Sequence, residues 1–211
     1  MTQRWTYIGN SFDSVESEQN SFSLFYKGNP PWDIGRPQKV FINLVKTLTI
    51  KGKILDVGCG TGENSILFAK YGFDVTGIDY VKEAIYQARV KANKRNVNVN
   101  FYILNALELE KLNQKFHIII DSGLFHTFTN PEREQFKESL SHVLLPNGLY
   151  YMLCFSNLEP PGFGPRRINK NEIYNTFNDN WELISIKPEI FESIFGNSKA
   201  WLAEIKYLGK N

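Results

Sequence analysis

The segment that most constrains the fold of this chain is a short apolar run followed by three closely spaced glycines. Residues 54–57 predict a buried strand, and Gly58, Gly60 and Gly62 follow at alternate positions. Apolar residues at 66–69 then predict a helix packed against a sheet. A strand, a glycine-rich turn and a helix open a nucleotide-binding βα unit, in which the chain turns sharply and a ligand approaches bare backbone. The sequence therefore predicts a ligand at this turn.

Two acidic residues flank the turn and bear on the kind of ligand. Asp56 lies two residues before the first glycine, and Glu63 directly follows the last one. The dinucleotide fingerprint is G-x-G-x-x-G, with a pyrophosphate at the helix N-terminus, whereas the spacing here is G-x-G-x-G. Two carboxylates would repel a pyrophosphate and would favour a ligand that carries positive charge. A dinucleotide site and a turn with no ligand remain the alternatives.

The run from Asp56 to Gly62, D-V-G-C-G-T-G, resembles motif I of the class I S-adenosylmethionine (SAM)-dependent methyltransferases. The cofactor of this family carries a sulfonium cation and an amino acid end, which agrees with the acidic flanks. The resemblance extends over nearly the whole chain. It implies an enzyme that moves the methyl group of SAM to sulfur, nitrogen or oxygen of a small-molecule acceptor. An NAD(P)-dependent oxidoreductase and a non-catalytic SAM-binding module are the alternative functions.

Strand and helix patterns alternate along the chain. A helix with the apolar face of residues 40–48 is predicted to begin at Pro37, because proline suits the first helical position. Another helix is predicted to begin at Pro131, and Asn169 with Glu172 predicts the start of a third. Strands are predicted at 54–57, 73–79, 97–104, 116–120, 149–155, 181–187 and 199–207.

This order of elements predicts an α/β fold: a Rossmann-like seven-stranded, mostly parallel sheet with helices on both faces and a terminal antiparallel strand pair. A dehydrogenase would more naturally continue with another parallel crossover or a separate catalytic domain. We expect a single methyltransferase domain over residues 1–211. Within it, residues 1–36 form an N-terminal cap segment over the cofactor, and residues 37–211 form the sheet core with a long loop at 156–168.

Composition limits the partners that the chain is expected to have. The formal net charge is +2, and small basic groups such as Lys91, Lys94 and Arg95 predict a solvated helix face. Two cysteines give neither a disulfide framework nor metal-ligand spacing. No apolar run approaches the length of a membrane span, and no signal-peptide pattern is present. We therefore expect a cytoplasmic enzyme with a small-molecule acceptor, no metal, and no nucleic-acid or membrane partner.

The resemblance assigns cofactor-binding roles to residues at the ends of the predicted strands. Asp56 and the backbone of Gly58 and Gly60 would lie along the methionine part of SAM. Asp79 would accept hydrogen bonds from the two ribose hydroxyls, and Tyr80 would pack on the adenine. A carboxylate at a strand end could instead cap the following helix.

Two further strand ends complete the implied cofactor site. Asn105 and Ala106 occupy the place near the adenine amino group where the family often has an acidic residue, so the asparagine departs from the family pattern. Asp121 and Ser122 would border the methionine end and the methyl group.

The resemblance becomes narrower at two places. Residues 29–37 look like the N-terminal segment of thiopurine/thiol S-methyltransferase-like proteins, which folds over the cofactor. This likeness places Trp32 against the sulfonium, where a cation–π contact is physically reasonable. Residues 121–126, D-S-G-L-F-H, are similar to the fourth-strand end of the same subgroup. His126 is the candidate general base and Asp121 the second catalytic candidate, although a histidine after a strand end could instead hydrogen-bond a loop.

The acceptor is expected to lie between the cap segment and the long loop. Tyr7 and Tyr26 in the cap segment, Phe163 and Arg166 in the loop, and His126 are the candidates for contact with it. A long loop in a compact domain is more often functional than idle. The methyl group on a sulfonium is already activated, so a thiol or a weakly basic ring nitrogen needs little or no help from a base.

Overall fold

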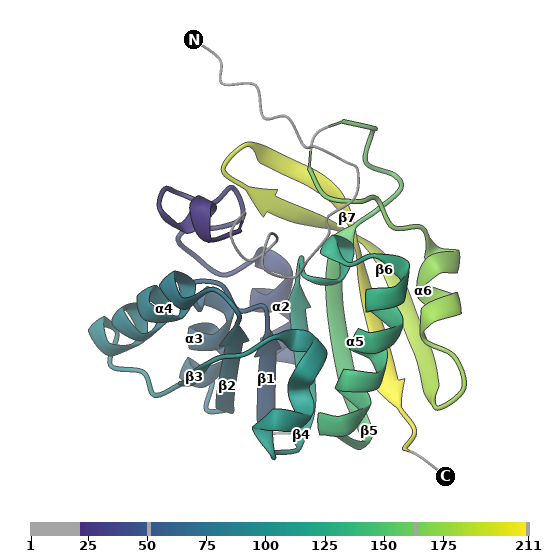
Figure 1. The fold of residues 1–211 in the computed structure, drawn as a ribbon, viewed down its shortest axis with the longest axis horizontal. Coiled ribbons are helices and arrows are strands. Elements are labelled where there is room, and N and C mark those ends of the chain that lie inside the picture. The colour runs from purple at the N-terminus through teal and green to yellow at the C-terminus, as the bar shows by residue number, and fades with distance from the viewer. Residues whose placement is uncertain (1–21, 50–51, 163, 210–211) are drawn as a thin grey trace.

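A computed structural model describes residues 22–49, 52–162 and 164–209 (Figure 1). Its strands are β1 (Lys53–Val57), β2 (Asp74–Asp79), β3 (Asn100–Ile103), β4 (Phe116–Ser122), β5 (Leu144–Phe155), β6 (Trp181–Ser193) and β7 (Gly196–Tyr207). In the described residues they form one seven-stranded sheet with the order β3-β2-β1-β4-β5-β7-β6. Neighbouring strands are parallel from β3 to β5, and β7 is antiparallel to both β5 and β6. The predicted fold class is confirmed.

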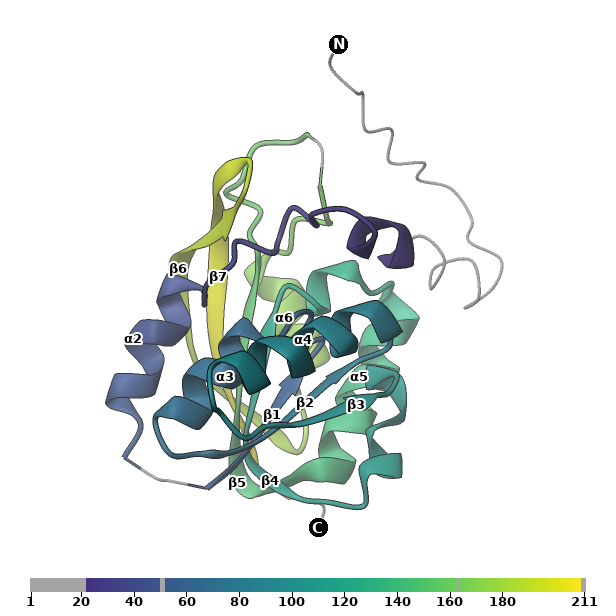
Figure 2. The ribbon, with the colours of Figure 1, turned by 90° about the vertical axis from the view of Figure 1, so that its left-hand side faces the viewer.

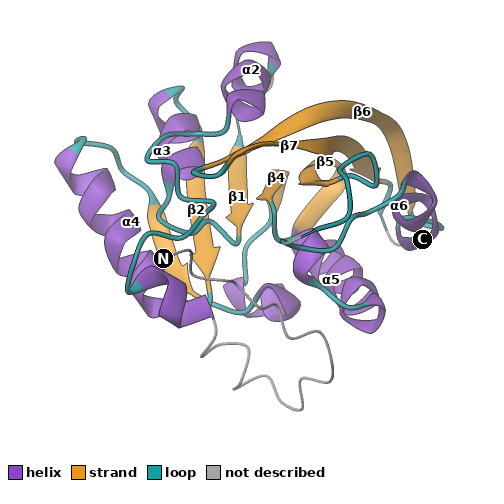
Figure 3. Cartoon of the chain, turned by 90° about the horizontal axis from the view of Figure 1, so that it is seen from above, coloured by secondary structure: helices purple, strands orange, loops and turns teal. Residues whose placement is uncertain are grey.

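Helices cover both faces of this sheet (Figure 3). They are α2 (Lys39–Thr47), α3 (Glu63–Lys70), α4 (Lys82–Lys94), α5 (Asn130–Val143) and α6 (Lys170–Thr176), with two 3₁₀ helices, η1 (Ala106–Leu112) and η2 (Phe125–Thr127). A further helical turn covers residues 22–26. Helices α2, α3 and α4 lie on one face, whereas η1, α5 and α6 lie on the other. No helix among the described residues is long and apolar enough to cross a membrane.

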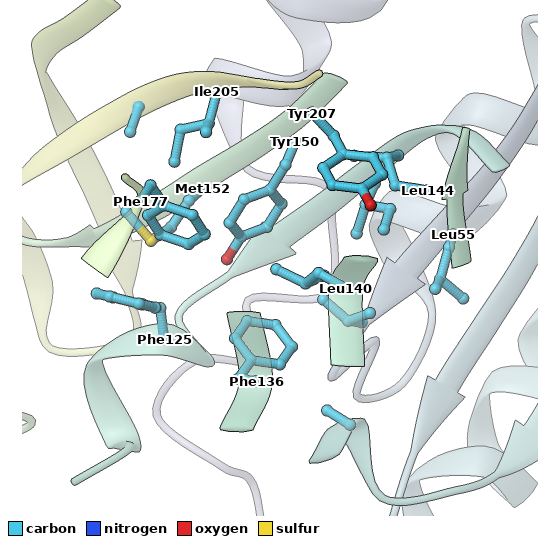
Figure 4. Packing of buried hydrophobic residues seen from close by; sticks show 14 of the residues in the cluster. Leu55, Phe125, Phe136, Leu140, Leu144, Tyr150, Met152, Phe177, Ile205 and Tyr207 are labelled. Atoms are coloured by element: carbon cyan, nitrogen blue, oxygen red, sulfur yellow. The ribbon is translucent and has the colours of Figure 1, made fainter. Parts of the chain in front are cut away.

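The apolar cores of the two faces come from alternate residues of the buried strands. Ile54 points to the cluster under α2 and α3, and its neighbour Leu55 points to the cluster under α5 and α6. In the second cluster the ring of Tyr150 lies between those of Phe136 and Phe177, at 6.1 and 5.6 Å between ring centres (Figure 4). The two clusters cover the faces of the sheet, and the loops that form the site lie at the carboxyl ends of the strands.

Of the predicted helix starts, one is confirmed, one is a residue late and one is wrong. Helix α6 begins with the predicted capping box, in which Asn169 and Glu172 each accept the other's backbone N–H, at 2.9 Å in both cases. Helix α5 begins at Asn130, one residue before the predicted Pro131, which lies in its first turn. Helix α2, however, begins at Lys39 and not at Pro37, because Gln38 is extended (φ −60°, ψ 137°) and its side chain bonds to a distant strand.

The register of the parallel strands brings the predicted acidic residues to one edge. Val57 at the end of β1 pairs with Ile78 of β2 on one side and with Asp121 of β4 on the other. Chain connections run outward in both directions from β1 and β4, so a crevice forms between these two strands at their carboxyl ends. Asp56 and Asp79 lie at this same edge, next to the glycine turn.

The final two strands are longer than predicted. They were expected over 181–187 and 199–207, but β6 and β7 continue toward each other until Ser193 pairs with Gly196. Pro188 weakened the strand pattern, yet β6 lies at the edge of the sheet, where a residue without a backbone N–H is tolerated. The added length lifts the tip of this β6–β7 hairpin above the sheet, beside the cap segment (Figures 1 and 2).

Candidate active site

The glycine turn after β1 has a backbone that other residues rarely adopt. Gly58, Gly60 and Gly62 have φ values of 66°, 53° and 83°. A Cβ atom on Gly60 would lie 3.0 Å from the hydroxyl of Tyr26, and one on Gly62 would lie 2.8 Å from the ring of Phe101. Glycine is therefore required both by the backbone angles and by the close approach of other groups.

Buried carboxyl groups hold the turn in place. Asp79 accepts hydrogen bonds from the backbone N–H of Gly60 at 3.0 Å and of Val81 at 2.9 Å. Asp56 accepts a hydrogen bond from the hydroxyl of Ser65 at 2.6 Å. Burial raises the pKa of Asp56 to about 7 and that of Asp79 to about 6. A nearby positive charge would stabilise the ionised form of both carboxyl groups and lower their pKa values.

A third buried carboxyl group, Asp121, organises the end of β4. It accepts the backbone N–H of Leu124 at 2.7 Å and of Phe125 at 3.0 Å, and the hydroxyl of Tyr150 at 2.8 Å. Burial raises its pKa to about 6, while these hydrogen bonds act in the opposite direction. Ser122, the next residue, is half-buried and lines the pocket described below.

One prediction about charge is wrong. Glu63 was counted among the acids available to a cationic ligand, but it is paired with Arg95 at 2.6 Å and with Lys91 at 3.0 Å. Of the cluster predicted to form a solvated face, Lys94 and Arg95 are exposed, whereas Lys91 is half-buried. The field that favours a cation comes from the three buried carboxyl groups at the strand ends, and Glu63 adds little to it.

The cap segment, in its described residues 22–36, lies across the glycine turn and α4 (Figure 2). Trp32 donates its indole N–H to the hydroxyl of Tyr26 at 3.0 Å, and its ring contacts Phe22 and Phe25. Tyr26 is buried, and its hydroxyl lies against Gly60. Tyr26 was predicted to contact the acceptor, but the structure places its hydroxyl between Trp32 and the glycine turn.

Polar contacts fix the cap segment to the turn. Asp33 accepts the hydroxyl of Thr61 at 2.7 Å, and Lys91 approaches Asp33 at 3.3 Å and Thr61 at 2.6 Å. Burial alone would raise the pKa of Asp33, but these bonds hold it below its ordinary value. No role in the site was predicted for these three residues. The position of Asp33 in a segment rich in proline and glycine was the sequence signal that could have indicated its role.

A second set of contacts fixes the cap segment to the β6–β7 hairpin. Arg36 forms a two-pronged ion pair with Glu192, at 3.0 and 2.9 Å. The side chain of Gln38 exchanges two hydrogen bonds with the backbone of Glu192, and Ile194 donates its N–H to the carbonyl of Pro31 at 2.9 Å. The cap segment is thus held from both sides of the crevice.

Between the turn, the cap segment and the hairpin lies a pocket with polar and aromatic walls. Its lining residues are Trp32, Asp33, Arg36, Gln38, Gly58, Cys59, Gly60, Thr61, Glu63, Asn64, Ser122 and Phe191. Bare backbone at Gly58 and Gly60, with three carboxyl groups beneath, is a fit for a ligand that carries a cationic centre. The pocket brings together the predicted residues of the cap segment, the turn and β4.

Phe191 of the pocket lining belongs to an aromatic wall, a group of three buried rings that also includes His126 and Phe155. The ring of His126 packs against Phe155 at 5.1 Å and against Phe191 at 5.9 Å between ring centres. Its Nδ1 accepts the backbone N–H of Phe155 at 3.0 Å, so the neutral ring carries its proton on Nε2. Burial, together with the charges of Arg133 and Arg167, lowers the pKa of His126 to about 3. Neither nitrogen of the neutral ring then has a free lone pair.

The residues expected near the adenine lie at the ends of β2 and β3. Tyr80 is half-buried and meets the ring of Phe22 edge-on at 6.0 Å. The side chain of Asn105 accepts the backbone N–H of Leu107 at 3.0 Å, which is the capping role that the sequence left open for a strand-end side chain. Ala106 is buried.

The remaining candidates for contact with the acceptor are not among the described residues that line the pocket. Arg166 is exposed and bonds to Asn130 at 2.7 Å and to Glu172 at 2.6 Å. Tyr7 and Phe163 lie outside the described residues.

Comparisons with known proteins show the family to which the chain belongs. A family model described as a methyltransferase domain matches residues 54–148, from β1 through the start of β5. A protein of Schizosaccharomyces pombe named uncharacterized methyltransferase C1348.04 is 32% identical over 115 residues, which are 54% of this chain and 79% of that protein. This chain is a SAM-dependent methyltransferase.

Two further similarities cover more of the methyltransferase. The 2-heptyl-1-hydroxyquinolin-4(1H)-one methyltransferase of Mycobacteroides abscessus is 29% identical over 185 residues, or 82% of each chain. A solved structure described as "Conversion of a Disulfide Bond into a Thioacetal Group during Echinomycin Biosynthesis" matches with a TM-score of 0.84 at 28% identity. That match covers 92% of this chain and 94% of the other. Both similarities extend well beyond the segment that the family model matches.

The raised pKa values of Asp56 and Asp79 predict that SAM binding depends on pH. A cationic ligand favours the ionised carboxylates, so SAM affinity should fall as the pH drops below their pKa values of about 7 and about 6. Each group that must lose its proton contributes up to about tenfold per pH unit below its pKa. Isothermal titration between about pH 8 and about pH 5.5 measures the slope. S-adenosylhomocysteine (SAH) keeps the ribose and the ammonium but lacks the sulfonium, so the difference between the two slopes measures the part due to the sulfonium. A SAM affinity that does not change over this range would contradict this account.

The same groups give the ligand-free protein the opposite trend. Their pKa values in the folded state lie above the ordinary value of 3.8, so the folded protein binds more protons than the unfolded chain between about pH 4 and pH 7. The free energy of unfolding should therefore fall as the pH rises through this window. Urea denaturation without ligand measures it, and a rise in stability over the same window would show that burial does not dominate these pKa values.

Proposed function

We propose that this methyltransferase moves the methyl group of SAM to sulfur, nitrogen or oxygen of a small aromatic or heteroaromatic acceptor. The aromatic wall next to Ser122 carries the proposal. The rings of His126, Phe155 and Phe191 pack together, with 5.2 Å between the centres of the two phenylalanines, and Phe191 lines the same pocket as Ser122. A flat apolar acceptor would bury its surface against such a wall. The hydroxyquinolone in the name of the Mycobacteroides relative and the disulfide chemistry named for the similar solved structure support this class.

We further propose how the chain holds SAM, which supplies a methyl group already activated by its positive sulfur. The backbone of Gly58 and Gly60 and the carboxylate of Asp56 lie along its methionine part. Asp79 accepts the ribose hydroxyls, since a carboxylate oxygen that already takes one backbone N–H has a second lone pair. Trp32 closes the site from the cap segment, where its ring excludes water and can face the cation.

The other predicted cofactor contacts follow the strand ends. Tyr80 packs on the adenine, and Asn105 and Ala106 lie near its amino group. Asp121 and Ser122 border the methyl end. Asp121 acts through the backbone that it holds, because its oxygens accept three hydrogen bonds. It is a positioning residue.

His126 was expected to be a general base, but the geometry supports a different proposal. Its Nδ1 is occupied by the Phe155 N–H, and a pKa of about 3 leaves no tendency to take up a proton near pH 7. We propose that His126 shapes the wall of the acceptor site and removes no proton. The acceptor then arrives with its own lone pair available, as a thiolate, a phenolate or a weakly basic nitrogen does.

Replacing His126 by asparagine tests this role. The amide oxygen of asparagine can accept the same backbone N–H, so methyl transfer to a thiol at saturating SAM should stay within about threefold, whereas loss of a general base costs about 100-fold or more. The dependence of kcat/KM on pH should follow the ionisation of the acceptor. If kcat falls by about 100-fold while the affinity for SAH is unchanged, His126 acts as a general base.

The function itself is tested by a methyl-transfer screen with labelled SAM. Thiols, phenols and N-heterocycles are offered to the wild-type enzyme, and the labelled product is identified. Small aromatic acceptors are expected to be methylated. Label found in a protein or in nucleic acid, with none in the small acceptors, would replace the proposed acceptor class.

A further inference from the structure

The buried side chain of Arg133 holds two N–H groups that nothing in the described residues satisfies. Arg133 lies near the start of α5 and is 2% exposed. Its Nη1 donates to Glu172 at 3.1 Å, and its guanidinium lies 4.7 Å from the centre of the Phe125 ring. Its Nε and Nη2 have no hydrogen-bond partner among the described residues. Leaving a buried charged donor unpaired is costly, so this pair of donors needs an explanation.

The two unsatisfied donors form one edge of the guanidinium. The N–H bonds of Nε and Nη2 point in parallel, and this fork matches the two oxygens of a carboxylate. Glu172 uses Nη1 and leaves the fork untouched. The edge formed by Nε and Nη2 therefore favours an anion with two oxygens in one plane. A single-atom anion would leave one of these two nitrogens without an acceptor.

Arg133 is on the acceptor side of the site. Phe125, under the guanidinium, follows directly on the segment that Asp121 holds. His126, the residue after Phe125, packs against Phe155 at 5.1 Å between ring centres. Arg167 in turn lies over Phe155 at 5.6 Å. The wall proposed to bind the acceptor is thus flanked by guanidinium groups.

Arg133 shares its acidic partner with a second arginine, the exposed Arg166. Arg133 and Arg166 both pair with Glu172, at 3.1 and 2.6 Å. One carboxylate cannot neutralise two guanidinium groups, so this corner of the described structure keeps a positive excess. Such an excess favours an anionic ligand.

We propose that Arg133 binds a carboxylate, or a planar anion with the same pair of oxygens, on the methyl acceptor. This inference rests on the proposed function and adds a substrate class to it: aromatic or heteroaromatic acids that carry a separate sulfur, nitrogen or oxygen nucleophile. The carboxylate pairs with the fork of Arg133, while the ring lies along His126 and Phe155. The acid group then orients the nucleophile toward the methyl end of the cofactor site.

Benzoate and its neutral analogue benzamide test the anion site without any turnover. Each is titrated by calorimetry into the SAH complex of wild type and of the Arg133→Met variant. Wild type should prefer benzoate by at least about tenfold, since hydrogen bonds to charged groups are the stronger ones, and Arg133→Met should lose that preference. Lys137→Met, which removes a charge from the same helix, should keep it. Absent benzoate binding, or an unchanged preference in Arg133→Met, would overturn the proposal.

Arg133→Lys covers the case in which the methionine variant does not fold. Lysine keeps the charge and lacks the fork, so the preference for benzoate should fall clearly below that of wild type. A full preference in this variant would also overturn the two-oxygen geometry. Methyl transfer to 4-mercaptobenzoate is measured separately. If benzoate binds as expected and no small acceptor is methylated, the proposed function fails while the anion site stands. If neutral thiols are methylated and benzoate does not bind, the proposed function stands and the anion site fails.

Discussion

Replacing Gly60 by valine is expected to weaken SAM binding by about 30-fold or more, because strain of about 1–2 kcal/mol and overpacking of about 1–3 kcal/mol act at the cofactor itself. Gly60 has a φ of 53°, which a β-branched residue adopts only with strain. Its Cβ would also lie 3.0 Å from the Tyr26 hydroxyl and would fill the space where SAM approaches bare backbone. Isothermal titration with SAM and SAH measures the loss.

Gly72→Val is the matched control for this variant. Gly72 follows α3, is exposed and has a φ of 88°, so valine there meets a similar backbone penalty away from the pocket. Both variants should lose stability, and Gly72→Val should keep the affinity for SAM. If the two variants bound SAM equally well, the turn would be a structural feature with no direct part in cofactor binding.

The second large effect is expected at Asp121. Its replacement by alanine leaves two backbone N–H groups and the Tyr150 hydroxyl without their acceptor, inside the protein. Each buried group left unpaired costs about 1–3 kcal/mol, so we expect the free energy of unfolding to fall by about 3–5 kcal/mol in total. Urea denaturation monitored by tryptophan fluorescence measures this change.

Two milder variants separate the stability lost with the hydrogen bonds of Asp121 from that lost with its charge. Asp121→Asn keeps one oxygen for these donors and should cost less than alanine. Tyr150→Phe removes one donor together with its need for a partner, so it should cost about 1 kcal/mol. Equal losses for alanine and for Tyr150→Phe would mean that the backbone of residues 124–125 does not depend on the carboxylate.

Much of this site could be predicted because its residues obey local rules. A three-glycine turn after an apolar strand has few other uses, and the side chains that follow parallel strands must meet at one edge. The Asn169–Glu172 capping box could likewise be read from spacing alone. Each of these features depends on neighbours within a few positions or on a sheet order that the element pattern specifies.

The parts that could not be predicted depend on partners far away in the sequence. Lys91 resembled a solvated residue because its partners, Asp33 and Glu63, come from two other segments. No role was predicted for Arg133, yet it is buried and pairs with Glu172 of α6. The role of His126 was open for the same reason, since the N–H that occupies its Nδ1 comes from the end of β5.

The ties between the cap segment and the hairpin link the release of ligand to the stability of the fold. Gln38 and Glu192 are 154 positions apart, and their paired bonds join an early segment of the chain to a late one. We expect a spent cofactor beneath the cap segment to leave when such contacts open, so its residence time should depend on local unfolding at the C-terminal strands as well as on its own affinity. Substitutions that loosen the hairpin would therefore speed turnover wherever departure of the product is the slow step.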